Sequence, residues 1–274
     1  MTVEHVHADD LAEREELFVR EVDEQPVQFV KPAHTDRPVW AAYQDGTYLG
    51  TVSAERDGSS TSWRVQATHE AHRTLDDAVR AMRRPAAWPQ ERDQAARWAA
   101  GLLSGDSLLI VDVETTGLDS PYAVQIAAVD RTGNVVFNEY LRPNAVIEPA
   151  AVAVHGITLQ RVAQAPTFGD LLPRLTRTLH GRAVVAYKAE FDRGVFDREL
   201  RRHLADPRAA QEWLGRIRWH DAIMPYAVWH GLWSAKRGTY RNQPLGGPHD
   251  AVADCRLLLT KLQAMARSAP ATRW

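Results

Sequence analysis

The chain has 274 residues, of which 45% are hydrophobic and 25% charged, and its net charge at pH 7 is −2. These values are typical of a globular protein with one or two domains, and they exclude a disordered or fibrous chain. The apolar runs are too short to cross a bilayer, the N-terminus lacks a secretory pattern, and the single cysteine excludes an intrachain disulfide, so we expect a cytoplasmic protein.

The charge is distributed unevenly along the chain. Residues 1–170 carry 15 Lys and Arg against 26 Asp and Glu, whereas residues 171–274 carry 18 against 9. The near-neutral total speaks against a nucleic-acid binder held by bulk basicity. The basic C-terminal part, however, can attract phosphate groups.

The first 85 residues fall into two predicted parts. Residues 1–35 form an acidic arm with one short amphipathic helix. Residues 36–85 form a small β-β-β-α domain, because three strand-like runs with an Asp45-Gly46 turn precede a capped helix that ends at Met82. We expect Trp40 and Trp63 to lie in its core rather than to form a base-stacking platform.

Residues 86–274 show alternating β and α patterns. Predicted strands are 107–112, 123–129, 134–141, 183–187 and one near 216–220; predicted helices are 90–103, 168–179, 189–204 and 250–266. Three closely spaced strands followed by helices and two isolated strands indicate a mixed sheet with helices on both faces, an α/β fold.

The sharpest local motif is Asp112-Val-Glu114-Thr-Thr-Gly117-Leu118 at the end of an apolar strand. Side chains two residues apart point to the same side of a strand, so Asp112 and Glu114 project together. A hard divalent cation such as Mg²⁺ or Mn²⁺ would remove their mutual repulsion. Taken alone, the motif also fits two surface carboxylates that cap the next turn.

Two further acidic positions carry the same chemistry. Asp192 lies at the start of a predicted helix that follows an apolar strand, and Asp254 follows His249 by five residues. Five residues span about 140° of a regular helix beyond one full turn, so these two side chains would not share a face. A helix that begins near Asp250 leaves His249 on a loop, where it can act as a general base for a water molecule.

The combination of Asp112-x-Glu114-Thr-Thr-Gly, Phe191-Asp192 and His249-x₄-Asp254 resembles the three motifs of the DEDDh (DnaQ-like) 3′–5′ exonuclease family. The motifs occur in the family's order and spacing. The resemblance covers roughly residues 92–266 and includes the segment Val154-His-Gly-Ile-Thr158. Residues 1–85 lie outside it.

The resemblance implies a ribonuclease-H-like fold, with a five-stranded mixed sheet whose second strand is antiparallel and which is flanked by helices. It implies hydrolysis at the 3′ end of a nucleic acid with release of nucleoside monophosphates. The residues implied to bind two divalent cations are Asp112, Glu114, Asp192 and Asp254, with His249 as the base. Those implied to contact the terminal nucleotide are Thr115, Thr116 and Leu118.

Lys188 and the segment 236–243 each have two interpretations, and Asp221 has a supporting role. Lys188 stands where the family usually has asparagine, and it either contacts a substrate phosphate or points outward. The segment 236–243, which includes Arg241, either closes over the substrate strand or is a solvated loop. Asp221 ends a short strand at a position that is often acidic in the family, and it can support the sheet edge.

The sequence favours a metal-dependent exonuclease acting on DNA 3′ ends. An exoribonuclease that trims RNA ends or oligoribonucleotides is the alternative, and a catalytically inactive nucleic-acid-binding protein is a third. Residues 1–100 carry 12 basic and 18 acidic residues, which would repel a phosphate backbone. For residues 36–84 a protein-interaction or self-association role is therefore favoured over a DNA-binding sheet.

Overall fold

The computed structural model describes residues 16–33, 35–58, 60–234 and 237–270. These form two compact units. The N-terminal unit comprises the chain up to Trp88 together with Gly231–Arg241. The second unit, which we call the catalytic unit after the catalytic residues predicted in it, comprises Pro89–His230 and the residues from Asn242 onward. Residues 231–241 thus pack with the N-terminal unit, although they were predicted as part of the domain 86–274. Within the described residues, no helix combines the length and apolarity that a membrane crossing requires.

The N-terminal unit is built on a six-stranded antiparallel sheet with its strands in chain order. These are β1 (Leu17–Val22), β2 (Gln25–Val30), β3 (Val39–Gln44), β4 (Thr47–Asp57), β5 (Ser60–Val65) and β6 (Ala71–His72). The helix α2 (Leu75–Met82) shares a core with one face of this sheet. The prediction that Trp40 and Trp63 belong to the core is confirmed, since both are fully buried.

The prediction of an acidic arm over residues 1–35 was wrong for residues 17–30, because they form β1 and β2. Asp23 and Glu24 have positive φ angles of 55° and 62°, as in the tight turn of a β-hairpin. The acidic residues of this segment therefore lie in a turn and on exposed strand positions rather than in a solvated helix. The part of the predicted helix before residue 16 lies outside the described residues.

The catalytic unit contains a five-stranded mixed sheet in the order β11-β10-β7-β8-β9. The strands are β7 (Leu108–Thr115), β8 (Ala123–Asp130), β9 (Val135–Tyr140), β10 (Ala183–Ala186) and β11 (Arg218–Asp221). β7, β10 and β11 are parallel, whereas β8 is antiparallel to both of its neighbours. The predicted α/β fold, with its antiparallel second strand, is confirmed.

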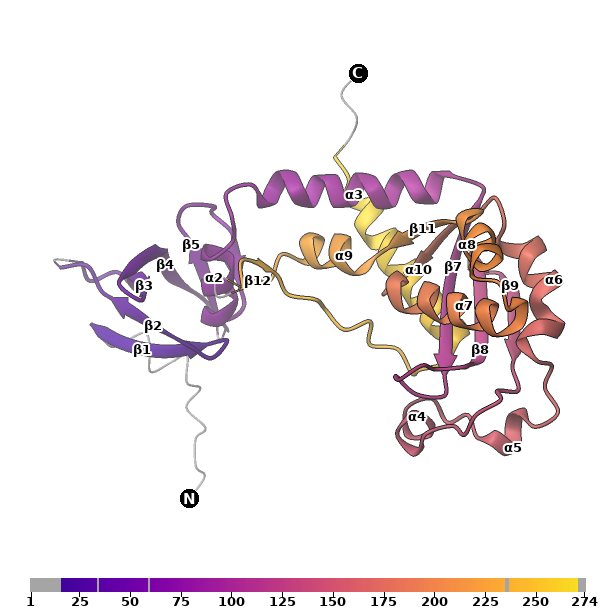
Figure 1. The fold of residues 1–274 in the computed structure, drawn as a ribbon. Coiled ribbons are helices and arrows are strands. Elements are labelled where there is room, and N and C mark those ends of the chain that lie inside the picture. The colour runs from indigo at the N-terminus through magenta and orange to yellow at the C-terminus, as the bar shows by residue number, and fades with distance from the viewer. Residues whose placement is uncertain (1–15, 34, 59, 235–236, 271–274) are drawn as a thin grey trace. The chain divides into compact units, whose positions relative to one another are not determined.

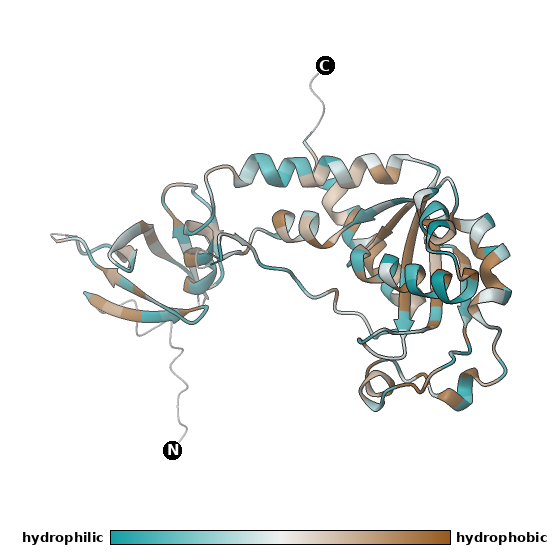
Figure 2. Cartoon of the chain, in the orientation of Figure 1, coloured by the Kyte–Doolittle hydropathy of each residue, from teal (hydrophilic) through white to brown (hydrophobic). Residues whose placement is uncertain are grey.

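Helices cover both faces of this sheet (Figure 1). Those bounding one core are α6 (Phe168–Leu179), α7 (Ala189–Leu204) and α8 (Pro207–Gly215). Those bounding the other are α3 (Trp88–Ser104), α9 (Ile223–His230) and α10 (Ala251–Arg267). Residues of β7 alternate between the two cores, so β7 is apolar along its length and hydrophilic only at its carboxyl end (Figure 2).

The sequence patterns missed several short elements. In the catalytic unit these are α4 (Pro149–His155), α5 (Leu159–Val162), α8 and α9; in the N-terminal unit they include the hairpin strands β12 (Trp233–Ser234) and β13 (Thr239–Tyr240). α4 and α5 together contain eleven residues, of which only Val162 is buried. Their patterns were too short for periodicity to reveal them.

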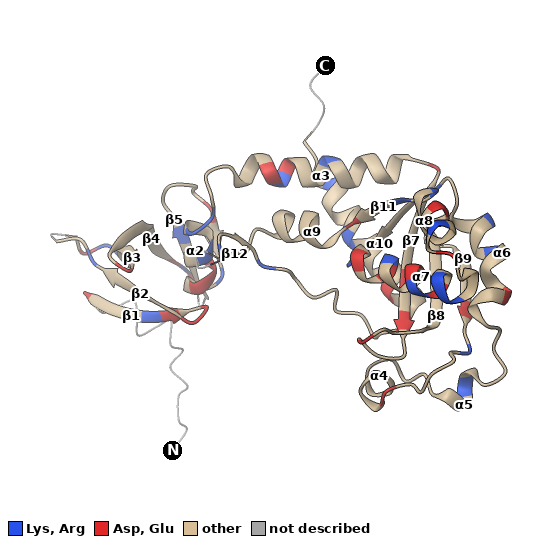
Figure 3. Cartoon of the chain, viewed as in Figure 1, with Lys and Arg blue, Asp and Glu red and all other residues tan. Residues whose placement is uncertain are grey.

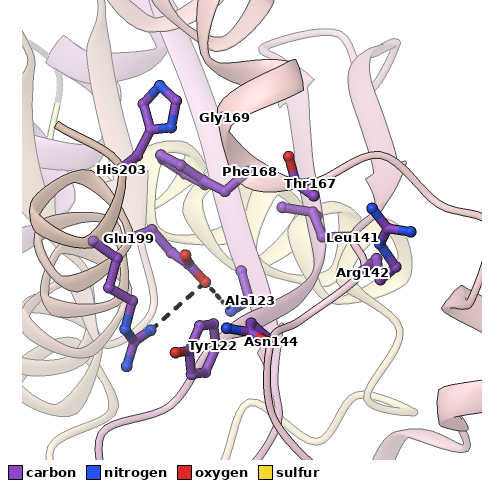
Figure 4. A pocket seen from close by; sticks show the side chains of 11 residues that line it. Tyr122, Ala123, Leu141, Arg142, Asn144, Thr167, Phe168, Gly169, Glu199 and His203 are labelled. Atoms are coloured by element: carbon purple, nitrogen blue, oxygen red, sulfur yellow. Dashed lines mark hydrogen bonds and ion pairs between the residues drawn. The ribbon is translucent and has the colours of Figure 1, made fainter.

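Side chains of α7 bind the backbone of the turn between β7 and β8 (Figure 4). Buried Glu199 accepts a hydrogen bond of 2.8 Å from the backbone N–H of Ala123. Arg202 donates to the carbonyl oxygens of Ser120 and Pro121 at 2.6 and 2.9 Å, and its guanidinium lies 3.5 Å above the ring of Tyr122. The helix that carries Asp192 therefore also positions the turn that carries Thr116 and Leu118.

We expect Glu199→Ala to lower the free energy of unfolding by about 1–3 kcal/mol, because it leaves the buried N–H of Ala123 without its acceptor. Denaturant unfolding followed by circular dichroism measures this loss. Glu212→Ala, which removes an exposed carboxylate from α8, is the matched control and should change stability by less than about 0.5 kcal/mol. Equal stability of the two variants would show that Glu199 does not stabilise the turn.

Candidate active site

The carboxyl end of β7 presents two acidic side chains on one side of the sheet. Asp112 and Glu114 alternate with Val111 and Val113, which belong to the core under α7, so both carboxylates face the side of α10. This end of β7 is acidic in Figure 3. The register with β8 shifts between Glu114 and Thr115, so the regular pairing ends inside the motif, directly after its second carboxylate.

Asp192 reaches the same region from the first turn of α7. It is 4% exposed, and the nearby backbone N–H of Val113 lowers the pKa of its carboxyl against the larger opposing effect of burial. Because Val113 lies between Asp112 and Glu114, the start of α7 meets the acidic end of β7 here.

Asp254 and His249 come from the start of α10 and the loop before it. α10 begins at Ala251, and the Asp250 side chain caps it by accepting the N–H of Ala253 at 3.0 Å. His249 therefore lies on the loop, as predicted, with a left-handed φ of 56°. The charge and the backbone N–H of His249 both lower the pKa of Asp254, which places the loop next to this carboxylate.

These residues line one pocket of about 380 Å³ in the catalytic unit. All four predicted metal ligands and His249 contribute to its wall. Potential ligand atoms of Glu114, His249 and Asp254 lie within 4.8 Å of one another. The structure therefore brings together the five residues on which the sequence analysis rested.

The electrostatics of the pocket show that its carboxylates repel one another. Burial and the neighbouring Asp192, Glu114 and Asp254 raise the pKa of Asp112 well above its usual value. Burial, followed by the charges of Asp254 and Asp250, raises the pKa of Glu114 to about 7. Burial is also the largest cause that raises the pKa of Asp192 to about 7, and it raises the pKa of Asp254.

The donor set fits a hard divalent cation. Carboxylate oxygens are the ligands that Mg²⁺ and Mn²⁺ prefer, and cations would relieve the repulsion that raises these pKa values. Asp254 also has a buried Oδ1 atom with no hydrogen-bond partner among the described residues. A buried carboxylate oxygen without a donor is costly, and coordination of a cation would satisfy it.

The loop before His249 is fitted closely to the site. A Cβ atom at Gly247 would lie 1.6 Å from Oδ1 of Asp254, so only glycine allows this approach. The hydroxyl of Tyr187 donates to the carbonyl oxygen of Gln243 and holds the start of the loop. The sequence analysis missed both residues; the Gly246-Gly247 pair just before His249 was the available signal.

The threonines of the motif take part in the β7–β8 turn. Thr115 donates its hydroxyl hydrogen to the Gly117 carbonyl at 2.8 Å, and the Thr116 hydroxyl accepts the N–H of Tyr122 at 3.0 Å. Leu118 on the same turn is 84% exposed. His155, within the segment 154–158, lies 3.0 Å from the carbonyl oxygen of Thr115 through Nε2. Contacts of these residues with a nucleotide stay a prediction.

The remaining predicted residues lie in different places. Lys188 is exposed at the N-terminus of α7 and lines the pocket. Arg241 does not line it: this residue belongs to the N-terminal unit, where its guanidinium lies 2.8 Å from the carboxylate of Asp23. Asp221 accepts the N–H of Ile223 at 2.8 Å and so supports the start of α9.

Comparison with known proteins yields several relatives. The chain is 28% identical over 179 residues to an uncharacterized exonuclease of Escherichia phage 186, covering 61% of this chain and 91% of that protein. It is 32% identical over 104 residues to DNA polymerase III subunit epsilon of Escherichia coli K12, covering 34% of this chain and 42% of the relative. The chain thus spans less than half of the epsilon subunit's length.

Solved structures of exonucleases are similar as well. Escherichia coli exonuclease I in complex with a dA16 oligonucleotide shows 23% identity and a TM-score of 0.45, over 58% of this chain and 41% of that chain. Exonuclease X in complex with 5′ overhanging duplex DNA shows 27% identity and a TM-score of 0.41, over 59% and 92%. The family model RNase_T, described as Exonuclease, matches residues 109–262, which is more than half of the chain. The chain therefore belongs to this family of DEDDh exonucleases and is a nuclease by descent.

Proposed function

We propose that the chain is a metal-dependent 3′–5′ exonuclease that hydrolyses terminal phosphodiester bonds of DNA and releases nucleoside monophosphates. The observation that carries this proposal is the convergence of four carboxylates and one histidine in a single pocket. Structural ion pairs do not explain the arrangement, because among the described residues the only basic side chains that line the pocket are Lys188 and His249.

The four carboxylates of Asp112, Glu114, Asp192 and Asp254 would hold two divalent cations, Mg²⁺ or Mn²⁺. When bound, such a pair of cations stabilises negative charge on both the attacking and the leaving oxygen of an in-line displacement. The raised pKa values of Glu114 and Asp192 support this assignment, since these groups are costly to ionise without a nearby positive charge.

His249 is the proposed general base. Its side chain is exposed on the loop, and its ring reaches the carboxylates of Glu114 and Asp254. A ring nitrogen can accept the proton of the attacking water, and the nearby carboxylates stabilise the imidazolium that results. Tyr187 and Gly247 serve this step indirectly, because they fix the loop on which His249 stands.

The β7–β8 turn is the proposed site of the terminal nucleotide. Leu118 presents an apolar surface against which a base can pack, next to Thr115 and Thr116. Lys188 stands at the pocket with a charged group of the right sign for a substrate phosphate. The roles of Thr115, Thr116 and Leu118 follow the family's pattern on matched residues, whereas Lys188 departs from it.

DNA is the preferred substrate in this proposal, because the epsilon-subunit relatives are named as parts of a DNA polymerase. An exoribonuclease would use the same pocket, and contacts to a 2′-hydroxyl decide between the two. A catalytically inactive binding protein is disfavoured, because all five residues are present and lie together.

A panel of end-labelled substrates tests the proposal. We expect purified protein with Mg²⁺ or Mn²⁺ to shorten 5′-labelled DNA stepwise from the 3′ end, and EDTA to stop the reaction. Asp112→Ala should reduce the rate by about 10³-fold or more, because loss of a group that stabilises charge at the reacting centre has an effect of about this size. Circular dichroism should show an intact fold. Faster digestion of matched RNA would establish the exoribonuclease, and an active Asp112→Ala variant would refute the metal assignment.

His249→Ala should separate the base from the metal ligands. We expect turnover to fall by about 10²–10⁴-fold, the usual contribution of a general base, with little change in Mn²⁺ affinity measured by calorimetry. Equal losses of turnover and of Mn²⁺ affinity would instead identify His249 as a ligand or a structural support. The matched control is His69→Ala, which removes an exposed histidine of the N-terminal unit.

Protons and metal should compete for the pocket. The folded-state pKa of Glu114, about 7, exceeds the ordinary glutamate value of 4.5, so without metal this group lowers the stability of the fold as the pH rises from 4.5 to 7. Asp192 acts in the same direction, from 3.8 to about 7. Added Mg²⁺ should therefore raise the melting temperature more at pH 8 than at pH 5.5. A shift that does not grow with pH, measured by scanning calorimetry, would contradict a carboxylate metal site.

A further inference from the structure

The N-terminal unit contains a second charged pocket, which we call the arginine pocket. It has a volume of about 110 Å³ and is lined by Arg83, Arg237, Arg241, Trp233, Ser234 and the turn 23–25. Its wall is built from three separate stretches: the β1–β2 turn, the residue after α2, and the β12–β13 hairpin. The hairpin overlaps the segment 236–243, which mixes cations with an aromatic residue, and its residues up to Arg241 belong to the N-terminal unit.

The pocket is organised around a single carboxylate. Asp23 lies 2.8 Å from Arg241, 3.1 Å from Arg80 and 3.3 Å from Arg83. Arg80 also pairs with Asp77 at 2.9 Å, and Glu24 lines the pocket. Among the residues that line the pocket, the three guanidinium groups of Arg83, Arg237 and Arg241 therefore face two carboxylates, and the excess of one positive charge matches the single negative charge of a phosphodiester.

Burial of the Arg83 guanidinium makes the excess positive charge of the pocket energetically unfavourable unless an anion balances it. Its side chain is 2% exposed and donates to the Gln44 side chain at 2.9 Å and to the Val22 carbonyl at 3.2 Å. Burial lowers the pKa of Arg83, and although Asp23 opposes this, the charges of Arg80 and Arg241 lower it further. An anion in the pocket would compensate a buried charge that its protein neighbours leave partly unbalanced.

The charge of the whole N-terminal unit agrees with an anionic ligand. Residues 1–16 carry one basic and six acidic residues, whereas residues 17–88 and 231–241 carry 12 basic and 10 acidic residues. The acidic balance of residues 1–100 therefore resides mainly in the first sixteen residues. The sheet and hairpin themselves have a net charge of +2, which does not repel phosphate.

The aromatic residue of the pocket indicates which phosphate compound fits. Trp233 is half-buried and packs edge-to-face on Tyr240, with ring centroids 5.0 Å apart. Bases of single-stranded nucleic acids stack on accessible aromatic rings beside cationic grooves. Trp40 and Trp63 cannot act in this way because they are fully buried.

We propose that the arginine pocket binds one backbone phosphate of a nucleic-acid strand, outside the catalytic pocket, with a base against Trp233. The choice of a nucleic-acid phosphate rests on the proposed exonuclease function, whereas the preference for an anion does not. Arg237 and Arg241 supply the accessible donors, and Arg83 supplies a buried positive charge beneath them. The site makes affinity depend on the length of the strand.

Arg237→Ala is the direct test, because within the described part of the chain no carboxylate pairs with Arg237 and the fold should be unchanged. The test uses the full chain with Asp112→Ala, so that the DNA is not degraded. Its binding to a labelled 20-nucleotide single-stranded DNA is measured by fluorescence anisotropy at about 50 to 300 mM salt. We expect Arg237→Ala to weaken binding about three- to tenfold and to reduce the slope of log K against log salt by about 0.7. Arg37→Ala removes an equal charge outside the pocket and should change neither by much.

Hydrolysis rates and phosphate binding complete the test. In a chain that retains Asp112, the Arg237→Ala variant should hydrolyse a trinucleotide at the wild-type rate and a 20-mer with a higher KM. Equal affinity and salt slope for Arg237→Ala and Arg37→Ala would overturn the proposal. Calorimetry with inorganic phosphate distinguishes a strand phosphate from a free phosphate ion. If Arg237→Ala abolishes binding of inorganic phosphate but leaves binding of the 20-mer unchanged, the pocket binds a free phosphate and the strand contact is refuted. A wild-type protein that hydrolyses no substrate would refute the exonuclease function and leave the binding comparison intact.

Discussion

The repulsion among four carboxylates held at the end of β7 is the constraint on which the rest of the catalytic unit depends. Asp112 and Glu114 are fixed by the alternation of a strand whose other residues fill two cores. Asp192 and Asp254 are fixed by the first turns of α7 and α10, which belong to those same two cores. The packing of both faces thus holds together groups that would separate in water, and bound cations would offset the repulsion that packing alone must resist.

The same constraint explains why hydrogen bonds reinforce the backbone around the pocket. The N–H groups of Val113 and His249 lie next to the carboxylates of Asp192 and Asp254 and lower their pKa values, so backbone dipoles oppose the effect of burial at both helix starts. Glu199 and Tyr187 act one step farther out, on the β7–β8 turn and on the His249 loop. Positioning of this kind limits the reorganisation required during reaction, which is where most electrostatic catalysis originates.

Local patterns predicted what local physics decides. The spacing of Asp112 and Glu114 specified a shared side of a strand, and the Gly-Gly-Pro segment before His249 specified that α10 begins after it. The patterns failed where long-range pairing decides. The sequence of residues 17–30 resembles an acidic arm, and only the pairing of β2 with β3 shows that this segment belongs to the sheet. Nothing near Arg241 in the sequence indicates its contact with Asp23, 218 positions earlier. Tyr187 was missed for the same reason, since its partner lies 56 residues away.

The distribution of charge illustrates the difference between sequence order and spatial order. The basic surplus of residues 171–274 is real, yet Arg237 and Arg241 belong to the N-terminal unit. The catalytic unit itself carries 20 basic and 19 acidic residues over residues 89–230 and 242–274. In the proposed mechanism, two divalent cations bound by the four clustered acids would add four positive charges where the reaction occurs. Metal binding would then govern substrate affinity as well as chemistry, and the proposed phosphate contact in the arginine pocket would supply affinity that does not depend on metal.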